Sequence, residues 1–201
     1  MIDERRSADP RLGGFPTGLA ALVAEAGKPA PARPVEQWNP PYCGEIDMRI
    51  TADGVWHYRG SRIARETLVR LFASILRREA DGSHVLVTPV EKVGLAVEDA
   101  PFVAVELAVE GRGAACVLTF RTNVGDIVAA GPEHPLRFAI QAGTDGLKPY
   151  LLVRGALEAL ATRSLTLELA NIADEKDGVA GLWSGGCFFP FPRPRNETGN
   201  V

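Results

Sequence analysis

Cysteine is scarce in this sequence, and the few cysteines are poorly placed for cross-links. The 201 residues contain three, Cys43, Cys116 and Cys187, an odd number at wide spacings. A disulfide framework needs pairs, and a zinc site needs close spacings such as Cys-x-x-Cys. We therefore expect three reduced thiols, as is usual in a cytoplasmic protein.

Long apolar runs and an excess of basic charge are also missing. No stretch approaches the roughly 18 consecutive apolar residues of a membrane-spanning helix, and residues 1–6 lack the apolar core of a secretory signal. The formal net charge is -3, from 22 basic and 25 acidic side chains, whereas a general nucleic-acid binder needs a large basic excess. We expect a cytoplasmic protein with no membrane span and no general nucleic-acid binding.

The short motifs of common catalytic and cofactor sites are absent as well. The sequence holds no G-x-x-x-x-G-K-[ST] phosphate loop, no H-E-x-x-H zinc motif and no G-x-S-x-G nucleophile elbow. Residues 111–113 begin like a dinucleotide fingerprint, but Cys116 stands where the third glycine belongs and a strand-like run follows. The three histidines are too scattered to indicate a metal site. We assign no catalytic residue, no metal and no cofactor.

Glycine and proline, in contrast, are abundant. Together they make up 36 of 201 residues, about 18% against a usual level of roughly 12%. This excess favours turns and strands over a helical bundle. The hydrophobic content of 46% is that of a globular protein, and the length allows one ordinary domain or two small ones.

The first 41 residues look like an appendage to the body. Thr17 is placed to cap a short helix that Gly27 would close, and its small apolar stripe should dock on another surface. Five prolines between residues 29 and 41 define an extended linker, and Trp38 within it is expected to anchor the linker to the body.

The body shows strand patterns and two helical patterns. Apolar alternation over residues 43–51, a turn at Asp53-Gly54 and a return over 55–58 predict a β-hairpin. Helical spacing predicts helices over 65–79 and 156–172. Short turn-separated apolar runs predict further strands in an antiparallel meander, over residues 84–88, 91–97, 102–109, 115–121, 136–140 and 150–153, with a closing hairpin over 182–189.

Arginine is unevenly distributed along the chain. Residues 49–78 hold seven arginines and two acids, and the same stretch carries Trp56 and Tyr58. Guanidinium groups bind phosphate oxygens, and aromatic faces stack on bases. Three interpretations stay open: an anionic-ligand pocket, a hydrophilic helix face whose arginines pair with carboxylates elsewhere, or a protein-binding surface. The candidate ligand-binding residues are Arg49, Trp56, Tyr58, Arg59, Ser61 and Arg65, expected in a cleft near Glu91, Lys92 and Asn123.

Several long segments resemble a bacterial family called domain of unknown function 1285. They include Cys-Gly-Glu-Ile-Asp-Met-Arg-Ile at residues 43–50 and Trp-Ser-Gly-Gly at 183–186, and the remaining segments are 53–61, 68–79, 87–94, 98–103 and 149–151. The resemblance covers about residues 42–191. It implies an α+β fold of two small, structurally related domains with mostly antiparallel sheets, the second superficially like a pleckstrin-homology fold.

We accordingly divide the chain into an appendage (1–41), a first domain (42–109), a second domain (110–192) and a loose tail (193–201). A short echo supports related halves, because Gly-Val-Trp at 54–56 resembles Gly-Leu-Trp at 181–183, although chance similarity is a rival explanation.

The resemblance further implies a ligand site between the domains, a nucleotide-like ligand and a link to signalling, but no assigned activity. We expect a non-enzymatic protein that binds a small anionic ligand. The alternatives are a protein–protein interaction scaffold without a small ligand, and a hydrolase acting on a phosphorylated ligand. The hydrolase would need Glu45, Asp47 or Asp99 beside a metal in the same cleft.

Overall fold

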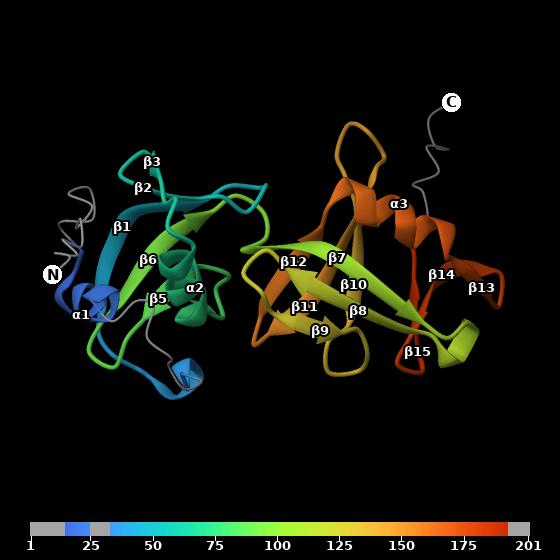
Figure 1. Cartoon of the computed structure of the whole chain (residues 1–201), viewed down its shortest axis with the longest axis horizontal. Coiled ribbons are helices and arrows are strands. Elements are labelled where there is room, and N and C mark those ends of the chain that lie inside the picture. The colour runs from blue at the N-terminus through green and yellow to red at the C-terminus, as the bar shows by residue number, and fades with distance from the viewer. Residues whose placement is uncertain (1–14, 25–32, 193–201) are drawn as a thin grey trace, which may run out of the picture.

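The chain folds into two domains that lie side by side, each built on a six-stranded sheet (Figure 1). The structure is a computed structural model that describes residues 15–24 and 33–192. The first sheet contains β1 (Tyr42–Ile50), β2 (Trp56–Tyr58), β3 (Ser61–Arg62), β4 (Leu76–Arg78), β5 (His84–Val87) and β6 (Lys92–Val97). The second contains β7 (Phe102–Glu110), β8 (Val117–Thr122), β9 (Ile127–Ala129), β10 (Leu136–Ile140), β11 (Leu147–Arg154) and β12 (Leu157–Ala161).

The two sheets have the same strand order. The first runs β3-β2-β1-β6-β5-β4, and the second, read from its far edge, runs β9-β8-β7-β12-β11-β10. In each sheet the strands that come first and last along the chain are neighbours and pair in parallel, β1 with β6 and β7 with β12. Every other pair in the two sheets is antiparallel. The predicted α+β fold with a duplicated core and mostly antiparallel sheets is therefore confirmed.

The helices and a small third sheet complete the domains. Along the chain, helix α2 (Glu66–Ser74) comes between β3 and β4 of the first sheet, whereas α3 (Arg163–Asn171) follows β12, the last strand of the second sheet. The third sheet follows α3 and is a meander of β13 (Asp174–Lys176), β14 (Val179–Ser184) and β15 (Cys187–Pro190). It confirms the predicted closing hairpin. Single-turn 3-10 helices lie at η2 (Val35–Gln37) and η3 (Gly113–Ala115).

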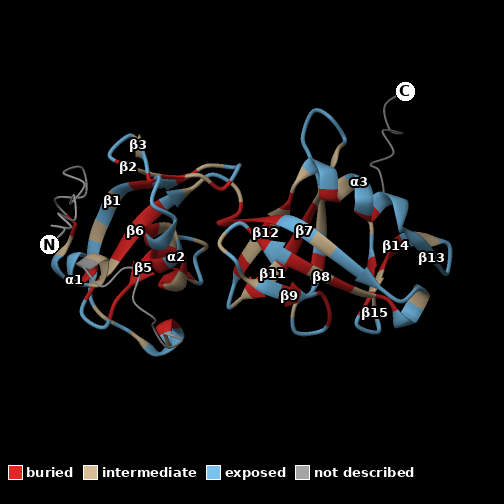
Figure 2. Ribbon diagram, viewed as in Figure 1, coloured by how far each residue is buried: buried red, intermediate tan, exposed pale blue. Residues whose placement is uncertain are grey.

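Buried residues lie mainly on β5 and β6 in the first sheet and on β11 and β12 in the second, and loop tips are exposed (Figure 2). In the first domain the amphipathic helix α2 places Phe72 against Trp56, with ring centroids 6.1 Å apart. In the second, Phe102, Leu118 and Phe120 are almost fully buried. Burying such large apolar side chains supplies the main driving force for folding.

The N-terminal appendage docks on the first domain, as predicted. The ring of Phe15 stacks on Tyr58 with centroids 4.3 Å apart, just before helix α1 (Thr17–Ala24), and Leu19 is fully buried. The buried Glu91 carboxylate accepts a 2.7 Å hydrogen bond from the Leu19 backbone N–H, in the first turn of α1, where a negative charge is favourable. Trp38 is packed against the core, which confirms its predicted anchoring role. The predicted helix end at Gly27 lies outside the described residues.

Both predicted body helices are shorter in the structure than expected. The helix predicted over 65–79 ends at Ser74, because Leu76–Arg78 leaves the helix to pair with β5 as strand β4. The helix predicted over 156–172 is instead strand β12 followed by α3, and the Thr162 hydroxyl caps α3 by accepting the Leu165 N–H at 3.4 Å. The sequence pattern does not predict strands β3, β9 and β13.

The division between the domains falls near residue 100. Strand β7 was expected to end the first domain, but it pairs with β8 and β12 in the second sheet. The first domain instead ends with β6, and residues 98–101 connect the two sheets. Hydrogen-bonded partners decide where a strand belongs, and they are not visible from the apolar pattern of that strand alone.

All three cysteines are free thiols, as expected from their number and spacing. Cys116 is buried, and this burial raises the pKa of its thiol. None of the helices in the described part of the chain has the length and apolar character that a membrane crossing requires.

Candidate functional site

The aromatic residues predicted to bind a ligand belong to the core of the first domain. Trp56 and Tyr58 are only 1% and 5% exposed, and their rings pack on Phe72 and Phe15 respectively. Side chains buried this far cannot stack on a ligand in an open cleft. Their role in this structure is packing, which the alternation of strand β2 could also indicate.

The arginines and the serine of the predicted site are spread over the surface of the first domain. Arg49 is exposed and pairs with Glu98, with 3.5 Å between Nε and the carboxylate. Arg59 has a left-handed backbone (φ 48°) at the turn after β2, and its guanidinium lies 5.3 Å from the Tyr58 ring. Ser61 lies in β3, and Arg65 precedes α2, where its Nε donates to the Thr67 hydroxyl at 3.1 Å.

The last three predicted residues have separate structural roles. Glu91 caps α1, as described above. Lys92 pairs with Glu79 at 3.6 Å. Asn123 joins the two domains, because its side chain accepts a hydrogen bond from the Val103 N–H at 3.1 Å and donates one to the Gly54 carbonyl at 3.2 Å.

The hairpin turn of the first domain meets the second domain at Gly54. This glycine has a φ of +79°, and a Cβ added there would lie 2.6 Å from Asn123 Nδ2 and 2.7 Å from Val103. Both the backbone conformation and the close approach therefore require glycine. The Asp53-Gly54 turn identified in the sequence is a contact between the domains as well as a hairpin turn.

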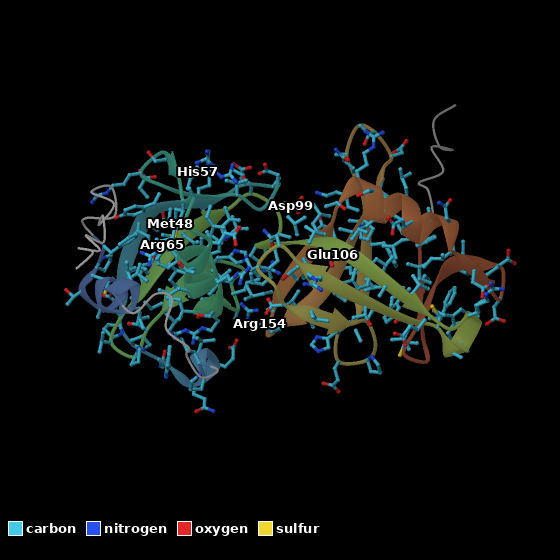
Figure 3. All side chains as sticks on the ribbon, in the orientation of Figure 1. Met48, His57, Arg65, Asp99, Glu106 and Arg154 are labelled. Carbon is cyan, nitrogen blue, oxygen red and sulfur yellow. The ribbon has the colours of Figure 1, made fainter. Side chains whose placement is uncertain are left out.

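A second interdomain contact centres on Arg154 at the end of β11. Its Nη2 donates a 2.6 Å hydrogen bond to the carbonyl of Ala73, near the C-terminus of α2 in the first domain. Its Nη1 pairs with Asp126 at 2.8 Å, and its guanidinium lies 4.9 Å from the Phe102 ring centroid. A cation is favourable at a helix C-terminus, where carbonyls lack helical partners. Figure 3 shows Arg154 and Asp99 in the zone between the two domains.

A polar cavity of about 410 Å³ opens in this zone. Arg78 and His84 line it from the first domain, and residues 99–101 line it from the connector. The second domain contributes Arg137 from β10, Tyr150 from β11, and Ala156 and Glu158 at β12. The cavity therefore exists only because the two domains are joined in this arrangement.

A network of charged side chains forms the second-domain wall of the cavity. Arg137 binds Glu158 through two hydrogen bonds of 2.8 and 2.7 Å, which raise the pKa of Arg137, and its guanidinium lies 4.0 Å from the Tyr150 ring centroid. The Tyr150 hydroxyl donates to Asp99 at 2.7 Å. Lys148 also binds Asp99, and this hydrogen bond raises the pKa of Lys148. Such a network fixes the orientation of each group before any ligand arrives.

The first-domain wall is different in character. Arg78 is exposed. Within residues 15–24 and 33–192 its one side-chain hydrogen bond is a 3.4 Å contact from Nε to the Gly82 carbonyl, and it has no ion-pair partner there. His84 is half-buried, and burial, with the nearby charge of Arg78, lowers the pKa of its imidazole. In the described part of the chain, the cavity thus combines a cation without a carboxylate partner and a histidine that is mostly neutral at pH 7.

The lowered pKa of His84 predicts how stability changes with pH. The unfolded chain, with an imidazole pKa near 6.5, takes up a proton before the folded chain does. Acidification through pH 6.5 should therefore lower the free energy of unfolding, at a rate of at most about 1.4 kcal/mol per pH unit from this group. Urea unfolding between pH 7.5 and 5.5 tests this, and His84→Gln should show a shallower loss. Equal pH dependence in both proteins would contradict the assignment.

The acids required by the hydrolase alternative do not gather in one place. Asp99 lines the interdomain cavity, Glu45 lines a separate groove with Tyr42 and Lys92, and Asp47 is exposed on β1. Among the described residues, no group of three histidine, cysteine or acidic side chains is arranged to hold a metal ion.

The cavity residues lie too far apart in the sequence to be recognised as a set. They extend from Arg78 to Glu158, on β4, β5, the connector and three strands of the second domain. Arg78 belongs to the arginine-rich stretch, and Asp99 is one of the acids that the hydrolase alternative needs, but no spacing links the two residues. The sequence signal that could have helped is the match of 98–103 and 149–151 to family segments, since both stretches contribute to the cavity.

Comparisons with known proteins agree with this two-domain arrangement. The model "Domain of unknown function (DUF1285), N-terminal domain" matches residues 33–100, and the model "Protein of unknown function (DUF1285), C-terminal domain" matches residues 101–191. The two models meet at the connector between the sheets. No curated protein matches the chain.

Two solved structures are similar to this chain. A DUF1285 family protein from Silicibacter pomeroyi DSS-3 is 51% identical, with a TM-score of 0.80, over 86% of this chain and 93% of that one. A DUF1285 family protein from Shewanella baltica OS155 is 26% identical, with a TM-score of 0.50, over 64% of this chain and 94% of that one. The chain belongs to the DUF1285 family.

Proposed function

We propose that this chain binds a small anionic, nucleotide-like ligand in the cavity between its two domains. The observation that carries the proposal is a polar cavity of about 410 Å³, lined from both domains, where the Arg78 guanidinium has no carboxylate partner among the described residues. This volume lies within the roughly 300–1,000 Å³ range of small-molecule sites.

The charge balance of the walls favours an anion. Arg137 is neutralised by Glu158, and Lys148 by Asp99. Arg78 remains, and its planar fork of donors suits phosphate or carboxylate oxygens. A bound anion would also favour protonation of the neighbouring His84, so the two groups would act together at mildly acidic pH.

The rest of the cavity favours a ligand with a polar body over a purely apolar one. The carboxylates of Asp99 and Glu158 can accept hydrogen bonds from hydroxyl or amino groups. The Arg137 guanidinium, stacked on Tyr150, presents a flat cationic surface that suits a planar ring. A ligand with its phosphate at Arg78 and its sugar or base toward Glu158 would make polar contacts with both walls of the cavity.

A ligand held by both domains would couple its binding to their relative position. Such coupling is one physical basis for a role in signal transduction, and the pleckstrin-homology-like character implied for the second domain fits that role. The proposal requires no reaction at the site. If no ligand binds, protein–protein interaction without a small ligand becomes the preferred function.

A thermal-shift and calorimetric panel of nucleoside mono-, di- and triphosphates and cyclic nucleotides tests the proposal. A ligand present at 100 times its dissociation constant adds about 2.7 kcal/mol to stability. We expect at least one compound to bind the wild-type protein, and Arg78→Gln to weaken that binding at least tenfold. Arg62→Gln is the matched control, because Arg62 is an exposed arginine of the first domain outside the cavity. No shift across the panel, or equal affinity in Arg78→Gln, would contradict the proposal.

A further inference from the structure

A second cavity, of about 310 Å³, lies within the second domain. It is formed where the end of β7 and the turn at η3 meet the end of α3 and the third sheet. Figure 1 places η3, β13 and β14 at the end of the second domain that is farthest from the first. This cavity is therefore separate from the interdomain cavity, and the two share no lining residue.

The walls of this cavity are mainly apolar. The Trp183 indole lines it from β14, together with Val109 from β7 and Ile172 from the end of α3. Val109 and Ile172 are 45% and 38% exposed, so each leaves apolar surface in contact with solvent. The buried Cys116 thiol also lines the cavity, and because burial raises its pKa it is a neutral, apolar surface at pH 7. A ligand with an apolar body would remove this surface from water.

Two opposite charges lie on the same cavity. Arg112, beside η3, and Asp174, at the start of β13, both line it and are both exposed. They form no ion pair with each other, and within the described parts of the chain neither has an oppositely charged partner within 4.0 Å. Among the described residues, the Asp174 carboxylate accepts one hydrogen bond, from the adjacent Glu175 N–H at 2.8 Å. The cavity thus offers a separate cation and a separate anion around an apolar interior.

We propose that this cavity binds a free α-amino acid with a bulky apolar side chain. The α-carboxylate binds Arg112, the α-ammonium binds Asp174, and the side chain packs against Trp183, Val109 and Ile172. A ligand carrying only a negative charge, such as a fatty acid or a nucleotide, would meet repulsion from Asp174. A wholly apolar ligand would leave both charges without a partner. The proposal does not depend on the function proposed for the interdomain cavity.

Isothermal titration calorimetry at pH 7 with three related compounds tests this assignment. L-Phenylalanine carries both charges, 3-phenylpropanoate lacks the ammonium group, and phenethylamine lacks the carboxylate. We expect L-phenylalanine to bind and each analogue to bind at least tenfold more weakly. No binding of L-phenylalanine, or equal binding of either analogue, would overturn the proposal.

Single substitutions place the binding in this cavity. Arg112→Gln and Asp174→Asn change exposed side chains, so both proteins should fold, and each should weaken L-phenylalanine binding at least tenfold. Arg121→Gln is the matched control on the neighbouring strand β8, since Arg121 pairs with Glu106 and does not line the cavity. Unchanged affinity in Arg112→Gln and Asp174→Asn would overturn the proposal. Arg78→Gln should bind L-phenylalanine as the wild type does, which separates this site from the interdomain cavity.

Discussion

Replacing Arg77 by methionine should lower the free energy of unfolding by about 3 kcal/mol. The Arg77 side chain is almost fully buried, and its Nη1 donates to the carbonyls of Val35 and Trp38 at 2.8 and 2.7 Å. Its Nε and Nη2 bind Glu79 at 2.9 and 2.6 Å. Methionine fills much of the space but leaves two carbonyls and a carboxylate without these donors. The segment around Val35 and Trp38 should then be held less firmly against the first domain.

The adjacent arginine provides the control for this experiment. Arg78→Met removes the same charge one residue later in β4, but its side chain is exposed and without an ion-pair partner among the described residues. We expect a change in stability below about 0.5 kcal/mol. Urea unfolding followed by circular dichroism measures both variants. Similar losses in the two proteins would show that the buried hydrogen bonds of Arg77 do not hold the appendage.

Replacing Arg154 by methionine should lower stability by about 2 kcal/mol and should also weaken ligand binding in the interdomain cavity. The substitution removes a charge-assisted hydrogen bond to Ala73, an ion pair with Asp126 and a contact with the Phe102 ring. The hydrogen bond contributes most, because the ion pair is about one-third exposed and is screened by water. Arg154 does not line the cavity. A loss of ligand affinity in Arg154→Met would therefore arise because the contact between the two domains is weaker.

Arg121→Met is the control for Arg154→Met. Arg121 also lies on a strand of the second sheet and also pairs with a carboxylate, Glu106 at 2.9 Å, but both side chains are more than half exposed and neither belongs to the first domain. We expect little change in stability or in ligand affinity. Small-angle scattering of Arg154→Met should show a broader distribution of domain distances than that of the control. Identical scattering and affinity in the two variants would contradict the role given to Arg154.

The sequence predicts the strands better than the connections between them. The hairpin at Asp53-Gly54 follows from alternation and a turn signal, and strand β10 has the predicted bounds. The repeated strand order was not visible in the same way. Trp56 lies in the second strand of the first sheet, whereas Trp183 lies in β14, outside both six-stranded sheets, so the echo between them does not mark equivalent positions. The strand order is therefore repeated in the two sheets although the Gly-x-Trp motif does not occupy equivalent positions in them.

Helix and strand were confused where apolar residues fit both periods. Residues 157–161 read as part of a helix because Leu157, Leu160 and Ala161 have helical spacing. In the structure Leu157, Ala159 and Ala161 are buried and the residues between them are less so, which is the period of a strand. Thr162, a good N-cap residue, marks where the helix begins. A short apolar run cannot be assigned by periodicity alone.

The candidate site was the least predictable feature. The density of arginines over residues 49–78 suggested a pocket, but Arg49, Arg70 and Arg77 pair with Glu98, Glu66 and Glu79. This outcome matches the alternative interpretation of that stretch, a face whose arginines pair with carboxylates. Arg78 belongs to the same stretch, and what distinguishes it is the absence of a carboxylate partner among the described residues together with its position opposite the second domain. Charge density along a chain does not reveal which charges find partners after folding.

A ligand in the interdomain cavity would contact both domains at once. The most direct test is a titration of the isotope-labelled protein, followed by two-dimensional NMR, with the nucleotide that gives the largest thermal shift. We expect the backbone signals of His84 in the first domain, Asp99 in the connector and Tyr150 in the second domain to move together, with a single dissociation constant. Shifts confined to one domain, or centred on Trp183 and Arg112, would contradict it.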